Sequence, residues 1–295
     1  MAAIEEASMN LLRTLLRYLS FPLFLLGGNA VMIGLVAAGA PLWQPLAALS
    51  AAVLLMMAIE RIIPWQRDWN RPQQDGWRDV AHALVNTASY HLGILLLPLL
   101  AGLAPAGLWP SGWPFWLQVV AALLVLDLGV SAAHHASHRW NWLWRFHAVH
   151  HSIRRLYGFN GLMKHPVHQS VEALAGIAPL LLLGIPQPVA TAATFCVAIQ
   201  LLLQHSNADY RSGPLKYVFA NAEVHRFHHV NRPGEGDVNF GLFTTLWDHL
   251  AGSFRYEPGR APRSTAEVGL ADRGDYPDGY LAQLLEPFRP ERPRG

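Results

Sequence analysis

Long apolar stretches dominate the first half of the chain, and their lengths predict helices that cross a membrane. Four of them approach or exceed the roughly 20 residues that the hydrocarbon core of a bilayer requires. They cover residues 19–38, 46–63, 80–103 and 113–133. Arg13 and Arg17 precede the first, as in a secretory signal, but this stretch is too long for the apolar part of a signal. We therefore expect it to be a retained anchor.

Two shorter apolar stretches follow, over residues 171–183 and 189–203, and the segment Gly184–Pro188 separates them. Glycine and proline interrupt helices, so we expect a short helical hairpin whose two ends return to the same side of the membrane. The last forty residues are polar and rich in proline and arginine. The predicted fold is all-α, with four transmembrane helices, this hairpin and a histidine-rich helical cap. The predicted regions are an N-terminal transmembrane region (1–112), a central histidine-rich domain (113–255) and a soluble tail (256–295).

The composition agrees with a membrane protein and excludes several other classes. Charged residues make up only 14% of the chain and hydrophobic residues 52%, whereas a soluble domain has about 25% charged residues. The net charge of +2 gives no indication of a nucleic-acid partner. A single cysteine, Cys196, excludes a disulfide framework and a cysteine-held metal cluster.

The distribution of arginine predicts the orientation of the chain. Arg61, Arg67, Arg71 and Arg78 lie between the second and third predicted spans, whereas residues 39–45 and 104–112 carry no charge. Because positive loops stay in the cytoplasm, the N-terminus and the histidine-rich part should face the cytoplasm. We expect an integral, multi-pass protein of a bacterial inner membrane.

Histidines provide the candidate chemistry. Thirteen of the fifteen lie between residues 134 and 249, and nine of these follow a pattern of a pair, a triplet, a single residue and a second triplet. The nine are His134, His138, His147, His150, His151, His205, His225, His228 and His229. Spacings of three and four residues put each set on one helix face, and neutral imidazole binds transition metals. Nine ligands exceed what one metal takes, so we predict two metals with positions left for oxygen or water.

Asp127 lies seven residues before His134, on nearly the same helix face and within an apolar span. A carboxylate there is costly and needs an interior partner. It either orients a ligand histidine through the second ring nitrogen or makes an unrelated hydrogen bond between helices.

The order of these motifs resembles the fatty acid hydroxylase/sterol desaturase superfamily. The matching segments are DLGVSAAHHASHRWNWLWRFHAVHHS from Asp127, KHP from Lys164, QHSN from Gln204, EVHRFHHV from Glu223, and NFG from Asn239 followed by LWDHLAGSF. The resemblance covers about residues 113–255. It implies an integral membrane enzyme that holds two iron ions with the histidines, uses O2, and hydroxylates or desaturates a lipid. No catalytic residues are expected beyond the metal ligands.

The remaining residues of these motifs have open roles. His165 is either a ligand or a residue that supports one, while His135, His168 and His249 are expected in supporting or structural positions. Asn239 either hydrogen-bonds a ligand or a metal-bound water, or is an ordinary turn residue. Asp248 and Glu223 either orient a histidine or form hydrogen bonds with backbone N–H groups.

The function predicted from these residues is O2-dependent oxidation of a sterol, fatty acyl or related lipid. The chain has no sequence signature of its own for carrying electrons, so a separate ferredoxin, rubredoxin or cytochrome-type donor is implied. Two alternatives stay open: a membrane electron-transfer protein with histidine-ligated haem, and a metal transporter, which should place its ligands near the bilayer midplane.

Overall fold

Helices make up nearly all of the regular structure, as the apolar pattern predicts. The computed structural model describes residues 1–101, 107–158, 160–232, 234–271 and 273–290. Within these ranges β pairing is limited to three isolated bridges. The α-helices are α1 (Ala2–Pro22), α2 (Asn29–Ala37), α3 (Trp43–Ile62), α4 (Gly76–Ala101), α5 (Phe115–Arg139), α6 (Asn141–His151), α7 (Pro166–Leu182), α8 (Gln187–His205), α9 (Ala222–His228), α10 (Leu246–Ala251) and α11 (Tyr280–Leu285). A π-helical turn, η1 (Leu23–Gly28), joins α1 to α2, and short 3₁₀ turns lie at η2 (Arg67–Asn70), η3 (Asn160–Leu162), η4 (Gly213–Tyr217), η5 (Thr265–Glu267) and η6 (Glu286–Phe288).

Four helical segments in the described part of the chain are long and apolar enough to cross a membrane. They are Ile4–Ala37, Trp43–Ile62, Phe115–Arg139 and Gln187–His205. The first three contain or overlap the predicted spans 19–38, 46–63 and 113–133. The fourth is α8, which the sequence had placed in a short hairpin. The predicted span 80–103 coincides with α4, although the side chains of residues 90–101 and all of residues 102–106 lie outside what the structure describes.

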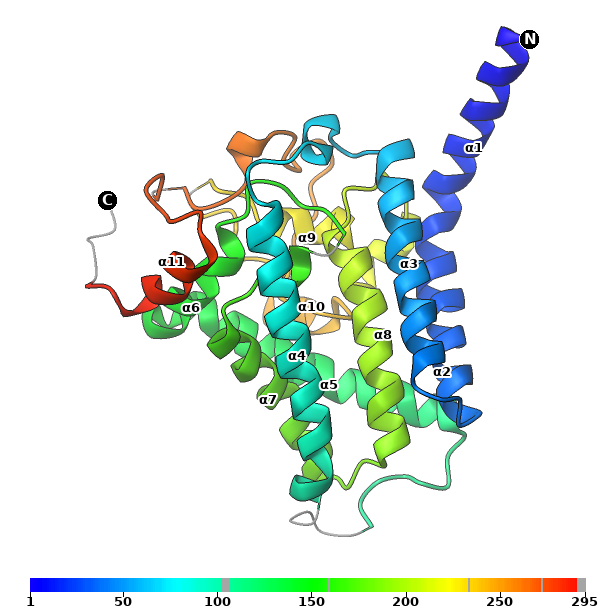
Figure 1. The fold of residues 1–295 in the computed structure, drawn as a ribbon, viewed down its shortest axis with the longest axis vertical. Coiled ribbons are helices and arrows are strands. Elements are labelled where there is room, and N and C mark those ends of the chain that lie inside the picture. Colours follow the sequence, from blue (N-terminus) through cyan, green and yellow to red (C-terminus); the bar gives the residue numbers. More distant parts are fainter. Residues whose placement is uncertain (102–106, 159, 233, 272, 291–295) are drawn as a thin grey trace.

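The predicted hairpin is present as α7 and α8, which a short connection joins, and α4 contacts both helices (Figure 1). Gly184 adopts a positive φ of 75° after α7, a conformation that glycine reaches without steric cost. Pro186 precedes α8, and Pro188 lies in its first turn, where its missing N–H is not needed.

Helices α5 and α7 pack with their backbones in contact, and two glycines make this possible. A Cβ added at Gly129 would lie 2.0 Å from the carbonyl oxygen of Ala175 and 2.9 Å from Cα of Gly176. Small residues at such a crossing let membrane helices approach closely. This contact fixes α5, which carries the first two candidate ligands, against the hairpin.

Gly129→Ala is therefore expected to lower the free energy of unfolding by about 3 kcal/mol, because the two helices must separate to admit the methyl group. The thermal unfolding midpoint in detergent measures this loss. Gly34→Ala in α2 is the matched control, since a Cβ there meets nothing within 4 Å. An equal midpoint for Gly129→Ala and Gly34→Ala would contradict the role of this contact.

A second, smaller core lies outside the helical bundle and includes the C-terminal residues. Val268 and Tyr276 are buried with Trp69, Val149 and Ile153. Nearby, α11 contacts α4 and η6 contacts α6 (Figure 1). The segment predicted as a soluble tail therefore packs against the histidine-rich part of the protein as far as residue 290.

Candidate metal centre

Nine histidine side chains converge at the ends of four helices. Helix α5 contributes a pair from its last turns, α6 a triplet and α8 its final residue, while α9 and the residue after it contribute the second triplet. The nitrogens form two groups, each with its ligand atoms within 4.8 Å of one another. The five-histidine group is His134, His138, His147, His151 and His228. The four-histidine group is His150, His205, His225 and His229. These are the nine residues that the sequence pattern singles out.

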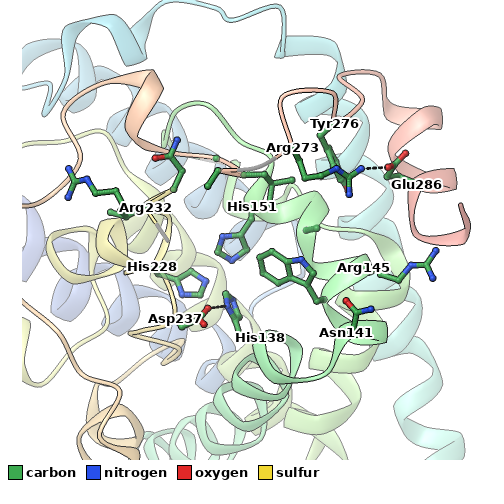
Figure 2. A pocket seen from close by; sticks show the side chains of 18 of the residues that line it. His138, Asn141, Arg145, His151, His228, Arg232, Asp237, Arg273, Tyr276 and Glu286 are labelled. Carbon is green, nitrogen blue, oxygen red and sulfur yellow. Dashed lines mark hydrogen bonds and ion pairs between the residues drawn. The ribbon is translucent and has the colours of Figure 1, made fainter. Parts of the chain in front are cut away.

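Each triplet is divided between the two groups. His147 and His151 of α6 belong to the five-histidine group, whereas His150 between them belongs to the other. In the second triplet the division is reversed, because His225 and His229 join the four-histidine group and His228 joins the five-histidine group. The i, i+4 pair of each triplet thus belongs to one group and the middle residue to the other. Figure 2 shows His138, His151 and His228 pointing toward one another.

The separations between ring nitrogens fit metal coordination. Neighbouring Nε2 atoms lie 2.9 to 3.3 Å apart within each group. A metal–imidazole bond is about 2.1 Å long, so two nitrogens bound at right angles lie about 3.0 Å apart.

Hydrogen bonding alone does not account for this packing. Nε2 of His147 lies 3.1 Å from Nε2 of His134, 3.1 Å from that of His138 and 3.0 Å from that of His151. One ring nitrogen offers either a single proton or a single lone pair. The donor set therefore fits two metal ions, one within each group.

Four of the nine rings are oriented through their other nitrogen. Nδ1 of His134 lies 3.0 Å from the carbonyl oxygen of Phe240, and Nδ1 of His228 lies 2.8 Å from that of Val238. Likewise, His150 approaches the carbonyl of Met163 at 3.1 Å. His138 differs, because its Nδ1 lies 2.8 Å from a side-chain oxygen of Asp237. Donation from Nδ1–H places the lone pair on Nε2, where a metal would bind.

Burial keeps these imidazoles neutral. Desolvation is the main reason why the pKa of each histidine in α6 and α9, and of His229, lies well below its usual value. The charge that the neighbouring imidazoles would carry lowers each pKa further. At neutral pH the rings are therefore in the form that binds metals.

Of the two roles expected for Asp127, orientation of a ligand histidine is not found, because its hydrogen-bond partners in the described structure are residues other than histidine. Its carboxylate accepts hydrogen bonds from the backbone N–H groups of Leu242, Phe243 and Thr244 at 2.7 to 2.9 Å, and from the Thr244 hydroxyl at 2.6 Å. It thus ties α5 to the loop that follows Phe240, whose carbonyl accepts from His134. Its influence on the ligand passes through the backbone.

Asp248 and Asn239 hold the same loop from its other side. Asp248 accepts from the N–H groups of Phe240 and Gly241 at 2.7 and 2.9 Å. Asn239, in a left-handed conformation with φ 56°, donates to the carbonyls of Val224 and Arg255. Both side chains therefore form hydrogen bonds with the backbone near Val238 and Phe240, whose carbonyl groups meet His228 and His134.

The remaining candidates lie outside both nitrogen groups. Glu223 accepts from the N–H of Ser212 at 2.6 Å and from Lys216 at 2.5 Å, at the start of α9. His165 accepts from the N–H of Val167 and caps the beginning of α7.

The three histidines expected in supporting positions also lie beside the centre or away from it. His168 lies 3.0 Å from the Ser137 hydroxyl, and its ring centroid is 4.3 Å from that of His147. His135 stacks on Phe240, and His249 stacks on Phe254.

Several residues besides the nine histidines hold the candidate ligands or the loops beside them, and the sequence did not assign them this role. Asp237 is one, and its only sequence signal is that it is an acid just before Asn239. His82 and Asn86 of α4 are others, because both bind the carbonyl oxygen of Lys164, next to the Met163 carbonyl that meets His150. Gln204 donates to the carbonyl of Gly241 at 2.7 Å.

Asp237→Asn is expected to weaken metal binding by the five-histidine group by about 10- to 100-fold, the usual effect of removing a carboxylate behind a ligand histidine. The measurement is the rate of metal loss to a chelator. Asp278→Asn is the matched control, since Asp278 is a similarly exposed acid that pairs with Arg154 instead of a histidine. Equal rates for the two variants would rule out the positioning role.

Comparison with known sequences places the histidine-rich part in a recognised group. The sequence model of the fatty acid hydroxylase family matches residues 119–253. The chain is 34% identical to ornithine lipid hydroxylase OlsE of Rhizobium tropici over 257 residues, which cover 84% of this chain and 76% of that protein.

More distant relatives match about half of the chain. Alkylglycerol monooxygenase of Xenopus tropicalis is 26% identical over 50% of this chain and 31% of its own length. Lathosterol oxidase of Mus musculus is 25% identical over 54% of this chain and 53% of its own length. The aligned part thus spans about a third to a half of these longer proteins. No solved structure matches the chain.

Proposed function

The chain belongs to the fatty acid hydroxylase family, and from this membership we propose that its nine histidines hold two iron ions for the oxidation of a membrane lipid by O2. The observation that carries the proposal is the convergence of the nine Nε2 atoms into a group of five and a group of four. Bound iron would supply the activation of O2 and the oxidising power for an unactivated C–H bond.

The protein's own part in this chemistry is geometric and electrostatic. Buried neutral imidazoles present lone pairs without having to lose a proton first. The carbonyls of Phe240, Val238 and Met163 fix the ring orientations. Both groups are almost fully buried, with His138 as the one partly exposed member. Burial of the four-histidine group limits the access of bulk water and side reactions there, whereas the cavity lined by His138, His151 and His228 leaves the five-histidine group accessible.

The substrate we propose is a lipid with an amino-acid headgroup. The similarity to ornithine lipid hydroxylase extends over 84% of the chain, whereas the sterol and alkylglycerol relatives match about half. The similarity to that relative thus extends beyond residues 119–253, which the family model matches.

Lipid mass spectrometry of bacteria with and without this protein tests the proposal. We expect an amino-acid lipid that gains one oxygen, or loses two hydrogens, only when the protein is present. A strain that makes the His228→Ala variant is the control for effects of expression. If the lipid profiles of all three strains agree, the proposed function is wrong.

We propose that electrons come from a separate protein of ferredoxin, rubredoxin or cytochrome type. Purified enzyme with NAD(P)H and O2 alone is then inactive, and addition of a ferredoxin with its reductase restores turnover. Full activity without a donor would reject this part of the proposal. We also propose that the histidine-rich side faces the cytoplasm of a bacterial inner membrane, which a green fluorescent protein fused to the C-terminus would test by its fluorescence.

Neither alternative suits the site as well. A haem needs two histidines on opposite faces of a flat macrocycle, whereas four or five Nε2 atoms gather around each position here. A transporter should bind its metal near the midplane of the bilayer, but these ligands come from the last turns of α5 and α8 and from short helices beyond them. An intense haem Soret band in the purified protein would reverse this choice.

A further inference from the structure

The short helix α11 arranges its side chains in the opposite way to a helix on a water-facing surface. Its polar residue, Gln283, is fully buried, whereas Leu281 and Leu285 are 71% and 62% exposed. Gln283 donates to the carbonyl of Pro277 at 2.8 Å, and its side-chain oxygen lies 2.9 Å from Nε2 of His82 in α4. These contacts fix which side of α11 is turned outward. A surface helix in water turns its apolar side chains inward, so the outer side of α11 suits an apolar environment.

Side chains of η6 and α6 extend this apolar surface. Phe288 of η6 is 68% exposed, and its ring centroid lies 5.6 Å from that of Phe146 in α6. Trp142, one turn before Phe146, and Trp140 are also more than half exposed. Contiguous exposed apolar side chains mark a surface that contacts a partner or a membrane. The apolar outer face consists of Leu281, Leu285, Phe288, Trp140 and Trp142.

The position of α6 sets the level of the apolar outer face relative to the membrane. Helix α6 begins directly after the segment Phe115–Arg139, which is long and apolar enough to cross a membrane. Trp140 and Trp142 therefore lie at the end of a span, where tryptophan is typical of the membrane interface. Helix α6 contacts η6, and Arg145 of α6 donates to the carbonyl of Arg289 (Figure 1). The C-terminal segment thus lies at the same level as the end of this span.

Helix α7 continues the apolar surface away from α11. It exposes apolar side chains at its start, middle and end, at Val167, Leu174 and Leu182. Its first turn adjoins α11, because Nε2 of His165 lies 3.2 Å from the carbonyl oxygen of Leu284. The apolar outer face is therefore continuous with an apolar helix of the hairpin, as expected if both contact lipid.

We propose that the apolar outer face lies in the interface of the lipid bilayer, so that α11 and η6 form a peripheral membrane contact in addition to the spans. Its partner is lipid instead of another protein, because the face adjoins both the end of a span and an apolar helix. The same segments form walls of the cavity beside the five-histidine group, since Arg145 of α6 and Glu286 of η6 both line it (Figure 2). The contact thus places an edge of that cavity at the level of the lipid headgroups. The membrane contact does not depend on the chemistry proposed for the metal centre.

Spin labels on the full-length protein, in nanodiscs of phosphatidylethanolamine and phosphatidylglycerol, test the proposal. The native Cys196 is buried and does not compete for the label, so one label is attached to each of Leu281→Cys, Leu285→Cys and Trp142→Cys. Collision of the label with O2, which concentrates in the bilayer, is compared with collision with a water-soluble nickel chelate. We expect the three labels to lie about 5–10 Å below the headgroup boundary, the usual depth of an interfacial helix.

Two reference positions calibrate the depth. Leu124→Cys carries its label on the exposed side of α5 within a span and should lie deeper, whereas Asp68→Cys, at an exposed position in η2, should collide mainly with the nickel chelate. Each labelled variant must unfold at the same temperature as the unmodified protein.

Labels on the outer face that behave like the label at Asp68→Cys would show that the face is in water and would overturn the inference. Protection from both reagents would mean that protein, such as a second copy of the chain, covers the face, and this would also overturn it. Contact of the labels with lipid in a protein that oxidises no lipid in cells would support the membrane contact and reject the proposed function.

Discussion

His150→Ala and His228→Ala are each expected to abolish lipid oxidation, with a loss of more than about a hundredfold. The two residues belong to different groups, so each change removes one nitrogen from a different metal position. A buried alanine offers no replacement ligand. Loss of a residue that only hydrogen-bonds a metal ligand already costs about 10- to 100-fold in metal affinity or activity, so loss of the ligand itself should cost more. The measurements are product formation and the iron content of the purified protein, which should fall from about two ions per chain towards one.

His249→Ala serves as the control for these variants. His249 lies outside both groups; among the described residues its ring nitrogen approaches the carbonyl of Tyr217, at 3.0 Å, and its ring stacks on that of Phe254. Its replacement is expected to leave both iron content and activity close to normal. Normal activity in His150→Ala or His228→Ala would remove that histidine from the proposed ligand set.

Asp127→Ala is expected to lower the free energy of unfolding by about 4 kcal/mol and to reduce the yield of folded protein. The carboxylate is fully buried and receives three backbone N–H groups and the hydroxyls of Thr244 and Ser131. Alanine would leave these donors without a partner, and each unsatisfied buried donor costs about 1–3 kcal/mol. The midpoint of thermal unfolding in detergent, with lipid present, measures the loss.

Two further variants make this result specific. Asp127→Asn keeps one acceptor oxygen and should lose less stability than Asp127→Ala. Asp68→Ala removes an exposed carboxylate that pairs with Arg71 at 3.6 Å, so its effect should be within about 1 kcal/mol of zero. If Asp127→Ala unfolds at the same temperature as Asp68→Ala, the loop from Leu242 to Thr244 does not depend on this carboxylate.

The sequence suggested that Asp127 and Asp248 could orient histidine rings directly. In the structure they act on a histidine through the backbone of a loop. Asp127 and Asp248 both bind backbone N–H groups of the loop from residue 240 to 244. This loop then offers the Phe240 carbonyl to His134. The sequence marks these acids as unusual, because a carboxylate in an apolar setting needs partners. It does not identify the partners, since backbone groups are present at every position.

The helical hairpin illustrates a similar limit. Gly184, Pro186 and Pro188 mark the break between α7 and α8 directly. The close contact of α5 with α7 depends on Gly129 meeting Ala175, forty-six residues further along the chain. Two glycines in different helices carry no sign that they face each other.

The sequence by itself determined that the protein is helical and membrane-bound, and it identified the nine histidines that come together. The length of an apolar stretch and the spacing of residues on a helix are local properties, so both can be recognised in the sequence. The tertiary structure alone decided how the nine divide into five and four, which carbonyl or acid orients a ring, and that the C-terminal segment walls a cavity beside one group. These features depend on how the ends of α5, α6, α8 and α9 lie relative to one another. Packing between residues far apart in the chain determines this arrangement.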